Sequence, residues 1–475
     1  MTTAVVVGSG PNGLAAAIRL SQAGVAVTVL EAADRPGGGT RTTELTEPGL
    51  LHDECSFAHP MGVASPFLAS LGLTDHGLDW AWPEVDLAHP LDDGPAGVLS
   101  RDMDRTLDSL DTVDRPRWRR TFGHLATGFD DLVEDLFRPV VGRPRHPLTL
   151  ARFGTSAFQS ATRLARRFDG DAARALYGGS AAHVFGRLDG PMSGAVGLLL
   201  TAAGHAVGWP VARGGSQAIT TAMVGVLESH GGTVRTSTPV SSLGEVDELV
   251  GARPDVVLLD TNPTDALRIA GDAVAPRIRR ALQRYRYGPA VHKVDYAIRG
   301  EVPWTNPECA RAGTVHVGGS WEEIVAAEAA TARGEMPERP FLLVGQQYVA
   351  DPSRSVGDLH PFYAYAHVPH GYDGDATEAV TAQVERFAPG FRDLIVSTHS
   401  RTAMQMAAYN PNYRGGDIGA GANGFPQLLL RPRPALHPYR LAERRLYLAS
   451  SATPPGPGVH GMCGFHAAQA ALADL

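Results

Sequence analysis

The chain has 475 residues, more than one hydrophobic core usually serves, so roughly two or three compact units are expected. It is 43% hydrophobic and 19% charged, which excludes a disordered chain and a coiled coil. Lys and Arg total 42 against 50 Asp and Glu, and the net charge of -8 argues against nucleic acid as a partner, because binding phosphates needs excess cations.

The first twenty residues predict a strand, a glycine turn and a helix. Residues 5–7 are an apolar strand run, the turn matches GxGxxG at Gly8, Gly10 and Gly13, and residues 14–20 are strong helix formers. Gly8 allows the sharp turn, Gly10 lets backbone amides approach a pyrophosphate, and Gly13 lets the helix pack close to the strand. This arrangement predicts a dinucleotide site at the start of the helix.

A second parallel strand is predicted over residues 25–30, with Glu31 at its end, 18 residues after Gly13. A carboxylate there accepts ribose hydroxyls and repels a 2′-phosphate, which favours FAD or NAD over NADP. Residues 419–424 also match GxGxxG, but no strand precedes them and Pro426 stands where a helix would begin. This second match is therefore not predicted to bind a nucleotide.

The middle of the chain predicts a helical cap followed by a sheet. Residues 111–137 and 148–177 are amphipathic and helical. From residue 290 the apolar period changes to two, and residues 341–344 and 362–368 continue this sheet, with a capping-box helix beginning at Ser320. Side chains that share one face of the last strand either line a pocket or pack in the core: Tyr363, Tyr365 and His367.

Basic residues on the predicted cap form either a solvated helix face or a contact for acidic lipid headgroups. They are Arg163, Arg166, Arg167 and Arg174.

The two ends of the chain carry motifs of a known group of enzymes. The turn at residues 35–38 resembles the Arg-x-Gly-Gly motif that follows the Rossmann acidic residue in the phytoene desaturase and amine oxidase group of FAD enzymes. Residues 446–464 are similar to the closing motif of phytoene dehydrogenase-like proteins. Segments that resemble the middle of that family are 209–216, 233–240 and 255–263.

The resemblance implies an α/β fold in which a discontinuous Rossmann-like FAD-binding domain is interrupted by an α+β substrate domain. The FAD-binding segments are 1–75, 201–285 and 430–475, the helical part of the substrate domain is 76–200, and its β-sheet part is 286–429. The residues implied to bind FAD, without a covalent bond, are Gly8, Gly10, Pro11, Asn12, Gly13, Glu31, Ala32, Arg35, Gly38, Gly39, Arg41, Val240, Gly458, Val459, His460 and Met462.

The closing motif also has a physical rationale. A strand at 446–449 leads through a glycine-rich loop to a small-residue helix at 465–472. The positive amide end of that helix would stabilise negative charge on the N1 and C2 oxygen side of a flavin.

The leading functional hypothesis is desaturation of an apolar, isoprenoid-like substrate by hydride transfer to flavin N5. The alternatives are an oxidase or dehydrogenase acting on a C–N or C–O bond of a small molecule, and a non-catalytic flavin-bearing interaction protein. Since no second strand-linked GxGxxG is present, oxygen, a quinone or another acceptor other than NAD(P) is expected to accept the electrons.

Candidates for proton chemistry are few. His59 is the first choice as proton acceptor because its unperturbed pKa lies near neutrality, although a structural role beside a proline turn is the alternative. Lys293 either acts with a water near the flavin or forms an ion pair with Asp295. Cys463 either tethers the flavin or is a buried small residue, and no motif predicts a metal site.

The compartment is predicted from the cysteines and the absence of targeting signals. Cys55, Cys309 and Cys463 are widely separated and odd in number, which favours a reducing compartment. The N-terminus shows no export signal, and the apolar stretch 195–207 is shorter than the ~20 residues that a bilayer span needs. We therefore expect a cytoplasmic protein that either does not contact a membrane or associates with it peripherally.

Overall fold

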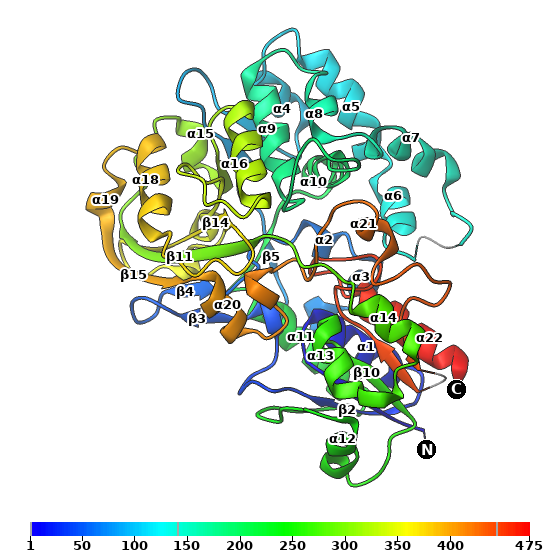
Figure 1. Ribbon diagram of the computed structural model, residues 1–475. Helices are drawn as coiled ribbons and strands as arrows, with labels where there is room; N and C mark the ends of the chain where they lie inside the picture. Colours follow the sequence, from blue (N-terminus) through cyan, green and yellow to red (C-terminus); the bar gives the residue numbers. More distant parts are fainter. Residues whose placement is uncertain (1, 140–141, 443–444) are drawn as a thin grey trace.

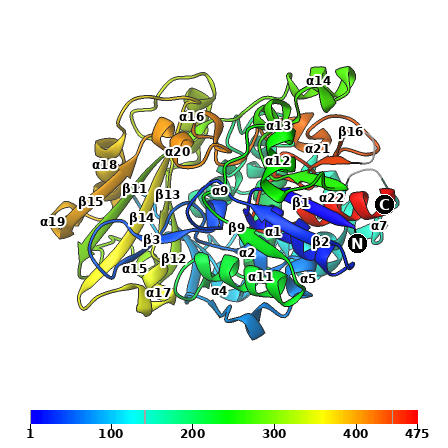
Figure 2. The ribbon, with the colours of Figure 1, turned by 90° about the horizontal axis from the view of Figure 1, so that it is seen from below.

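The computed structural model describes residues 2–139, 142–442 and 445–475. Two sheets and a helical cap make up the molecule (Figure 1), and Figure 2 shows the two sheets side by side. Both chain ends lie in the lobe that holds the N-terminal strand (Figure 1).

Within the residues that the structure describes, the first sheet has six strands in the order β16-β17-β10-β1-β2-β9, all parallel except β16, which is antiparallel to β17. The strands are β1 (Thr3–Val7), β2 (Ala26–Leu30), β9 (Thr233–Arg235), β10 (Val256–Leu259), β16 (Arg440–Ala442) and β17 (Leu446–Leu448). Its central strands consist almost entirely of apolar residues, because helices cover both faces of the sheet and bury the side chains on each side.

The helices on the two faces of this sheet come from distant parts of the chain. On one face α1 (Pro11–Ser21) packs against α22 (Met462–Asp474) and α11 (Gln217–Ser229). The other face buries its side chains with those of α12 (Leu243–Val250), α13 (Pro263–Ala270) and α14 (Pro276–Leu282). The predicted Rossmann-like unit of discontinuous segments is confirmed.

The second sheet, again counted over the described part of the chain, has seven strands in the order β15-β11-β14-β13-β12-β6-β7. They are β6 (Val85–His89), β7 (Gly97–Leu99), β11 (Ala290–Arg299), β12 (Ala312–Val317), β13 (Leu342–Gly345), β14 (Leu359–Val368) and β15 (Ile395–Arg401). The helices around it are α15 (Pro307–Ala310), α16 (Trp321–Ala332), α17 (Gln347–Ala350), α18 (Thr377–Phe387), α19 (Phe391–Leu394) and α20 (Ala403–Tyr409). The capping box predicted at Ser320 is present at the start of α16.

The cap covers the top of the molecule in Figure 1. Its helices are α4 (Met103–Asp108), α5 (Arg115–Thr127), α6 (Phe129–Leu136), α7 (Pro147–Ala157), α8 (Ala161–Ala165), α9 (Asp171–Ala182) and α10 (Gly194–Ala206). The segments 111–137 and 148–177, predicted to be helical, each contain several short helices. In the first of these segments the break falls at Gly128, which lies between α5 and α6.

Short elements connect these units. The paired strands are β3 (Thr42–Glu44) with β4 (Leu51–Asp53) and β5 (Trp80–Ala81) with β8 (Val211–Ala212). The short helices are α2 (Pro60–Val63), α3 (Pro66–Ala69) and α21 (Gln427–Leu430), with 3-10 turns η1 (Gly38–Thr40), η2 (Leu73–His76), η3 (Gly271–Ala273), η4 (Pro352–Arg354) and η5 (Arg414–Gly416).

The structure corrects three details of the sequence analysis. The segment 76–200, predicted to be helical, also supplies β6 and β7 to the edge of the second sheet. The boundary predicted at residue 200 falls inside α10. The strand predicted over 233–240 ends at Arg235, because Ser237 adopts a positive φ of 51° that is incompatible with an extended strand.

Within the described ranges, none of the helices combines the length and apolar character that crossing a membrane requires.

Candidate functional site

A cavity of about 1130 Å³ joins the glycine turn of the first sheet to the helical cap. The glycine turn contributes Gly10, Pro11 and Asn12, the following turn contributes Gly38 and Gly39, and the closing loop contributes Gly458, Val459 and His460. These eight predicted FAD-binding residues therefore lie around one space, although more than 400 positions of the sequence separate the first from the last.

The other predicted FAD-binding residues do not line the cavity. They are Gly8, Gly13, Glu31, Ala32, Arg35, Arg41, Val240 and Met462. Val240 and Met462 are packed in apolar cores. Arg35 pairs with Glu54 at 3.3 Å, with 42% of its side chain exposed. Their assignments to FAD stay predictions.

Steric constraints explain the three motif glycines. Gly8 has a φ of +99°, in the region that favours glycine. A Cβ on Gly13 would lie 2.1 Å from the Gly8 carbonyl oxygen, and a Cβ on Gly10 would lie 2.8 Å from Oδ2 of Asp260. The turn at the start of α1 thus packs against the end of β10 as tightly as its backbone allows.

Asp260 is a functional candidate that sequence reasoning missed. It follows directly after β10, is 7% exposed, lines the cavity, and accepts the N–H of Gly13 through Oδ2 at 2.9 Å. Burial raises the pKa of this carboxyl to about 7. The available signal was a carboxylate at the end of an apolar strand, but the sequence does not show that β10 pairs with β1.

Glu31 lies at the end of β2, as predicted, and its carboxylate is bonded within the chain. Oε2 accepts the N–H of Ser9 at 2.9 Å, and Oε1 accepts the N–H of Ala33 at 2.9 Å and pairs with Arg41 at 3.3 Å. It thereby ties the glycine turn to the second strand, and its role toward a ribose stays a prediction.

The closing loop is fixed against the start of α1. A Cβ on Gly464 would lie 1.7 Å from the Asn12 carbonyl oxygen, so α22 rests directly on the turn. The Ser65 hydroxyl donates to the His460 carbonyl oxygen at 2.6 Å. Burial lowers the pKa of His460 to about 4, so its imidazole is neutral at pH 7.

Cys463 is buried behind this loop and does not line the cavity. Its thiol donates to the carbonyl oxygens of Thr453, at 3.4 Å, and Gly456, at 3.2 Å, and burial raises its pKa to about 12. Such a thiol is a poor nucleophile. The structure therefore favours the buried small residue over the covalent tether.

His59 lines the cavity and is 2% exposed. The Ser216 hydroxyl donates to the Ser56 carbonyl oxygen at 2.6 Å, so the 2.8 Å contact between Nε2 of His59 and this hydroxyl assigns the ring proton to Nε2. Burial lowers the pKa of His59 to about 4. A neutral imidazole with so low a pKa is a weak base at pH 7, and the catalytic assignment stays a prediction.

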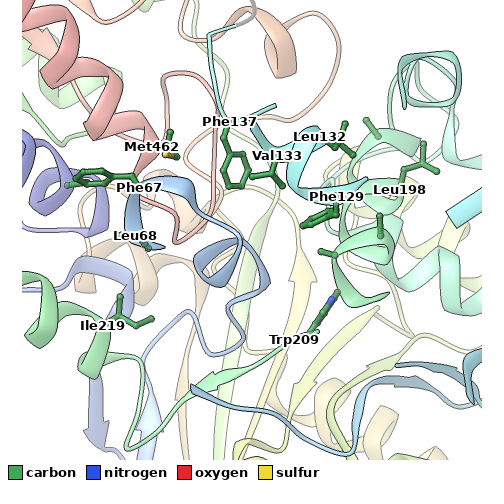
Figure 3. Close-up of a cluster of buried hydrophobic side chains, with 14 of the residues drawn as sticks. Phe67, Leu68, Phe129, Leu132, Val133, Phe137, Leu198, Trp209, Ile219 and Met462 are labelled. Carbon is green, nitrogen blue, oxygen red and sulfur yellow. The ribbon is translucent and has the colours of Figure 1, made fainter. Parts of the chain in front are cut away.

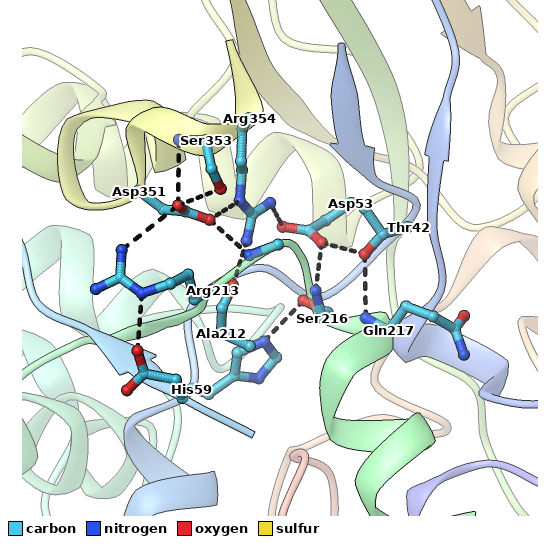
Figure 4. Close-up of polar contacts among 12 residues, drawn as sticks. Thr42, Asp53, His59, Ala212, Arg213, Ser216, Gln217, Asp351, Ser353 and Arg354 are labelled. Atoms are coloured by element: carbon cyan, nitrogen blue, oxygen red, sulfur yellow. Dashed lines mark hydrogen bonds and ion pairs between the residues drawn. The ribbon is translucent and has the colours of Figure 1, made fainter. Parts of the chain in front are cut away.

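A buried polar network extends from His59 toward the second sheet (Figure 4). Ser216 donates its N–H to Oδ1 of Asp53 at 2.8 Å, and the guanidinium of Arg354 pairs with both Asp53 and Asp351. Arg354 also donates to the Ala212 carbonyl oxygen at 2.8 Å. The network therefore holds together β4, β8, the start of α11 and η4 beside the cavity.

Lys293 and Asp295 form an ion pair, each with a side chain that is 1% exposed. Nζ of Lys293 lies 4.4 Å from the ring centre of Tyr363, and His52 and His399 approach Asp295 at 3.5 Å and 3.7 Å. Neither Lys293 nor Asp295 lines the cavity. The ion-pair alternative is the one that the structure shows.

Of the three aromatic candidates on β14, only Tyr365 lines the cavity. Tyr363 is covered by the loop after β4, where its hydroxyl donates to the Cys55 carbonyl oxygen at 2.5 Å. His367 is buried at 2.7 Å from a carboxylate oxygen of Glu328. The prediction of a pocket role is therefore wrong for Tyr363 and His367, because neighbouring segments cover that part of the face.

The cap side of the cavity is an apolar chamber, a feature that sequence reasoning did not locate. Its walls include Phe137, Phe153, Phe158, Phe185, Leu199, Leu200 and Trp209. Phe137 lies beside the chain segment that ends in Met462 (Figure 3), and its ring centre is 4.8 Å from that of His460. Phe158 is 63% exposed, so the chamber reaches solvent at α7.

The second GxGxxG match forms part of the cavity wall. Asp417 accepts the N–H groups of Gly288, Gly419 and Gly421 at 2.7 to 2.9 Å, which shapes the loop without a preceding strand. Gly419, Ala420 and Asn423 line the cavity. The match therefore lacks the strand-turn-helix geometry of a nucleotide site, as the sequence predicted.

Among the described residues, no group of three or more His, Cys, Asp or Glu side chains is arranged to hold a metal ion.

Comparisons with known proteins agree with the geometry of the first sheet. The family described as NAD(P)-binding Rossmann-like domain matches residues 6–68. Pyridine nucleotide-disulfide oxidoreductase domain-containing protein 2 of Rattus norvegicus is 23% identical over 564 residues, which cover 99% of this chain and 93% of that protein. Hydroxyneurosporene desaturase of Cereibacter sphaeroides is 27% identical over 517 residues, covering 99% and 97%.

The fold itself is also found among solved structures. A putrescine oxidase variant superposes with a TM-score of 0.63 at 17% identity, over 100% of this chain and 98% of that one. At this level of identity the likeness concerns the fold. These comparisons show that residues 6–68 are similar to NAD(P)-binding Rossmann-like domains and that the whole chain is similar in sequence to a hydroxyneurosporene desaturase and in fold to a putrescine oxidase.

Proposed function

We propose that this chain is a FAD-dependent oxidoreductase, similar to phytoene dehydrogenases, that desaturates an apolar, isoprenoid-like substrate. The observation that carries the proposal is the continuity of one cavity, which runs from the glycine turn at Gly10, past the closing loop at Gly458, into the apolar chamber at Leu199. A dinucleotide cofactor and an apolar molecule would meet in that space.

The residues of the glycine turn fit FAD sterically. The cradle at the start of α1 is kept open by Gly10 and Gly38, where a side chain on Gly38 would lie 3.1 Å from the Cα of Gly10. Among the described residues, the Asn12 N–H at this helix start has no intramolecular acceptor, so it remains available for a phosphate oxygen. Gly458, Val459 and His460 would hold the ring end without a covalent bond.

FAD, when bound, would accept a hydride at N5 and pass the electrons to oxygen or a quinone. The chain's own contribution is orientation and exclusion of water. The aromatic and aliphatic walls of the chamber lower the local dielectric and leave an apolar substrate few polar contacts. The desaturase relative at 27% identity supports this substrate class.

A second candidate function is oxidation of a C–N or C–O bond in a small molecule. Two tyrosines, Tyr365 and Tyr413, and two amides, Asn410 and Asn412, line the same cavity and would suit a polar substrate. The likeness of the fold to putrescine oxidase is consistent with this alternative. A flavin-bearing interaction protein without turnover is the third.

Peripheral contact with a membrane would supply an apolar substrate directly. Arg163 and Arg166 are exposed on the cap, while Arg174 pairs with Glu322 at 2.5 Å and Arg167 donates to Ser156 at 3.0 Å. Among the described residues, Arg163, Arg166 and Arg167 form no ion pair, and three cations are few for binding acidic lipids, which supports the solvated face over a headgroup contact.

Cofactor binding is tested by purification and titration. The protein is expected to show flavin absorbance, or to acquire it when FAD is added. Gly10→Val is expected to lower FAD occupancy at least ten-fold, because the new side chain would collide with Asp260. Gly424→Ala in the second GxGxxG match is the control, since a Cβ there meets nothing within 4 Å. A wild-type protein that stays colourless after addition of FAD contradicts all three functions.

Substrate class is tested by anaerobic reduction of the bound flavin. Acyclic isoprenoid hydrocarbons in detergent micelles are expected to bleach the flavin, and primary amines and alcohols are not. Leu199→Trp is expected to slow this bleaching at least ten-fold at unchanged FAD content, because the larger ring fills the apolar chamber.

Val396→Trp is the matched control, because Val396 is 45% exposed on β15. Bleaching by amines or alcohols alone would support the second function, and bleaching by no candidate in a broad metabolite extract would support the third.

A further inference from the structure

The carboxylate of Asp260 occupies the position where the start of α1 offers its backbone donors. Oδ2 accepts the N–H of Gly13 at 2.9 Å. The Gly10 N–H also faces this carboxyl and lowers its pKa. Gly10 and Gly13 both face Oδ2 so closely that a Cβ on either would lie within 2.9 Å of it. An anion belonging to the chain itself therefore lies against the anion-binding end of the helix.

Apart from the Asn12 N–H, the other donors of the turn are already committed. Gly8 donates to the Leu30 carbonyl oxygen at 2.8 Å, Ser9 to Glu31 at 2.9 Å, and Leu14 to the Gly10 carbonyl oxygen at 2.9 Å. Pro11 has no N–H. A pyrophosphate that binds at this turn must share its donors with Asp260 or lie directly beside it.

No positively charged side chain described in the structure pairs with Asp260 to offset its negative charge when a pyrophosphate binds beside it. The ionisable groups that face it are Glu31 at the end of β2, which is acidic, and Cys463 on α22, whose thiol is neutral. Among the described residues, no Lys or Arg forms an ion pair with Asp260. Its polar neighbour is Asn412, whose amide donates to the Asp260 carbonyl oxygen at 3.1 Å.

We propose that Asp260 must carry a proton when a dinucleotide is bound at this turn, so that binding of FAD takes up one proton from solvent. This inference rests on the proposed FAD site and adds a cofactor-positioning residue to it. In its neutral form Asp260 loses the charge that repels the pyrophosphate, while its carbonyl-type oxygen still accepts the Gly13 N–H.

The proposal predicts how FAD affinity depends on pH. The pKa of Asp260 is raised to about 7, chiefly by burial, so in the free protein this carboxyl is mostly protonated below that pH and ionised above it. The Kd for FAD is therefore expected to be nearly constant from pH 5.5 to about 7 and then to rise up to ten-fold per pH unit. Calorimetric titration with FAD at pH 8, in buffers of different ionisation enthalpy, is expected to show uptake of nearly one proton.

Asp260→Asn provides the variant test. Asparagine has the same shape and keeps an oxygen acceptor for Gly13, so the fold is expected to persist, which a thermal melt checks. The variant is expected to bind FAD with a pH-independent Kd, at least ten-fold tighter than the wild type at pH 8.5, and without proton uptake. Asp86→Asn is the control, since burial raises the pKa of Asp86 to about 6 beside Trp209 and Arg101, away from the turn.

The outcomes are distinguishable. A wild-type Kd that does not change between pH 7 and 8.5, or a pH dependence that survives in Asp260→Asn, would overturn the inference and leave the FAD site intact. If wild type and variant both fail to bind FAD at every pH, the proposed function itself is wrong. Proton uptake measured by calorimetry on the wild type tests the inference even when the variant is unstable.

Discussion

Gly464→Ala is expected to destabilise the protein by about 3 kcal/mol and to abolish binding of FAD. The added methyl group would lie 1.7 Å from the Asn12 carbonyl oxygen and 3.0 Å from the Ala16 nitrogen. Both obstacles are backbone atoms of α1, so no side-chain rotation relieves the overlap, and α22 must move away from the turn. Thermal unfolding and flavin absorbance measure the two effects.

Gly123→Ala is the matched control for this change. Gly123 lies inside α5, and a Cβ there would be 3.6 Å from Cγ of Arg119, an ordinary contact. Alanine is favoured over glycine in a helix by about 1 kcal/mol, so the control is expected to be neutral or stabilising. If Gly464→Ala behaves like the control, the close packing of α22 on α1 does not define the site.

Arg354→Leu is expected to cost about 3–5 kcal/mol of stability, the range for breaking a buried pair by removal of one partner. The guanidinium is fully buried between Asp53 and Asp351, which are fully buried as well. Without Arg354, Asp53 loses its cationic partner, Asp351 keeps the longer 3.7 Å pair with Arg213, and the Ala212 carbonyl oxygen loses one of its donors. Chemical denaturation measures the loss.

Arg299→Leu provides the comparison, because the pair between Arg299 and Asp358 has side chains that are 57% and 62% exposed. Exposed pairs contribute about 0–1 kcal/mol, so this change is expected to be nearly silent. Equal effects of the two substitutions would show that burial does not set the strength of the Arg354 network. Because Ser216 links the network to His59, Arg354→Leu is also expected to weaken FAD binding.

The network of Arg354 illustrates why part of the site could not be predicted. Asp53, Ser216 and Arg354 are separated by 163 and 138 residues of sequence, with no motif around Arg354 to indicate a contact. His59 was singled out for the intrinsic pKa of its side chain, but its hydrogen-bond partner comes from residue 216 and its low pKa comes from burial. Partners and burial are properties of the assembled fold.

The aromatic residues of β14 also show that the sequence predicts the face of a strand on which a side chain lies but not what that side chain contacts. The period of two correctly placed Tyr363, Tyr365 and His367 on one face of the strand, because alternation is a local property of extended backbone. Which of them reaches the cavity depends on the loop at Cys55, which covers Tyr363, and on Glu328, which meets His367. Only the packing of those distant segments distinguished the three.

The sequence by itself determined the features that adjacent residues produce. The strand, turn and helix at Gly8 to Gly13, the carboxylate after β2, and the strand and helix around the closing loop all follow from local sterics and hydrogen bonding. Tertiary structure alone decided that Asp260 lies against this turn, because strand order in a parallel sheet is set by long crossover connections that carry no local signal. Tertiary structure also decided that the cap encloses an apolar chamber. A cavity forms where side chains from several distant elements do not fill the space between them, and this depends on how those elements pack.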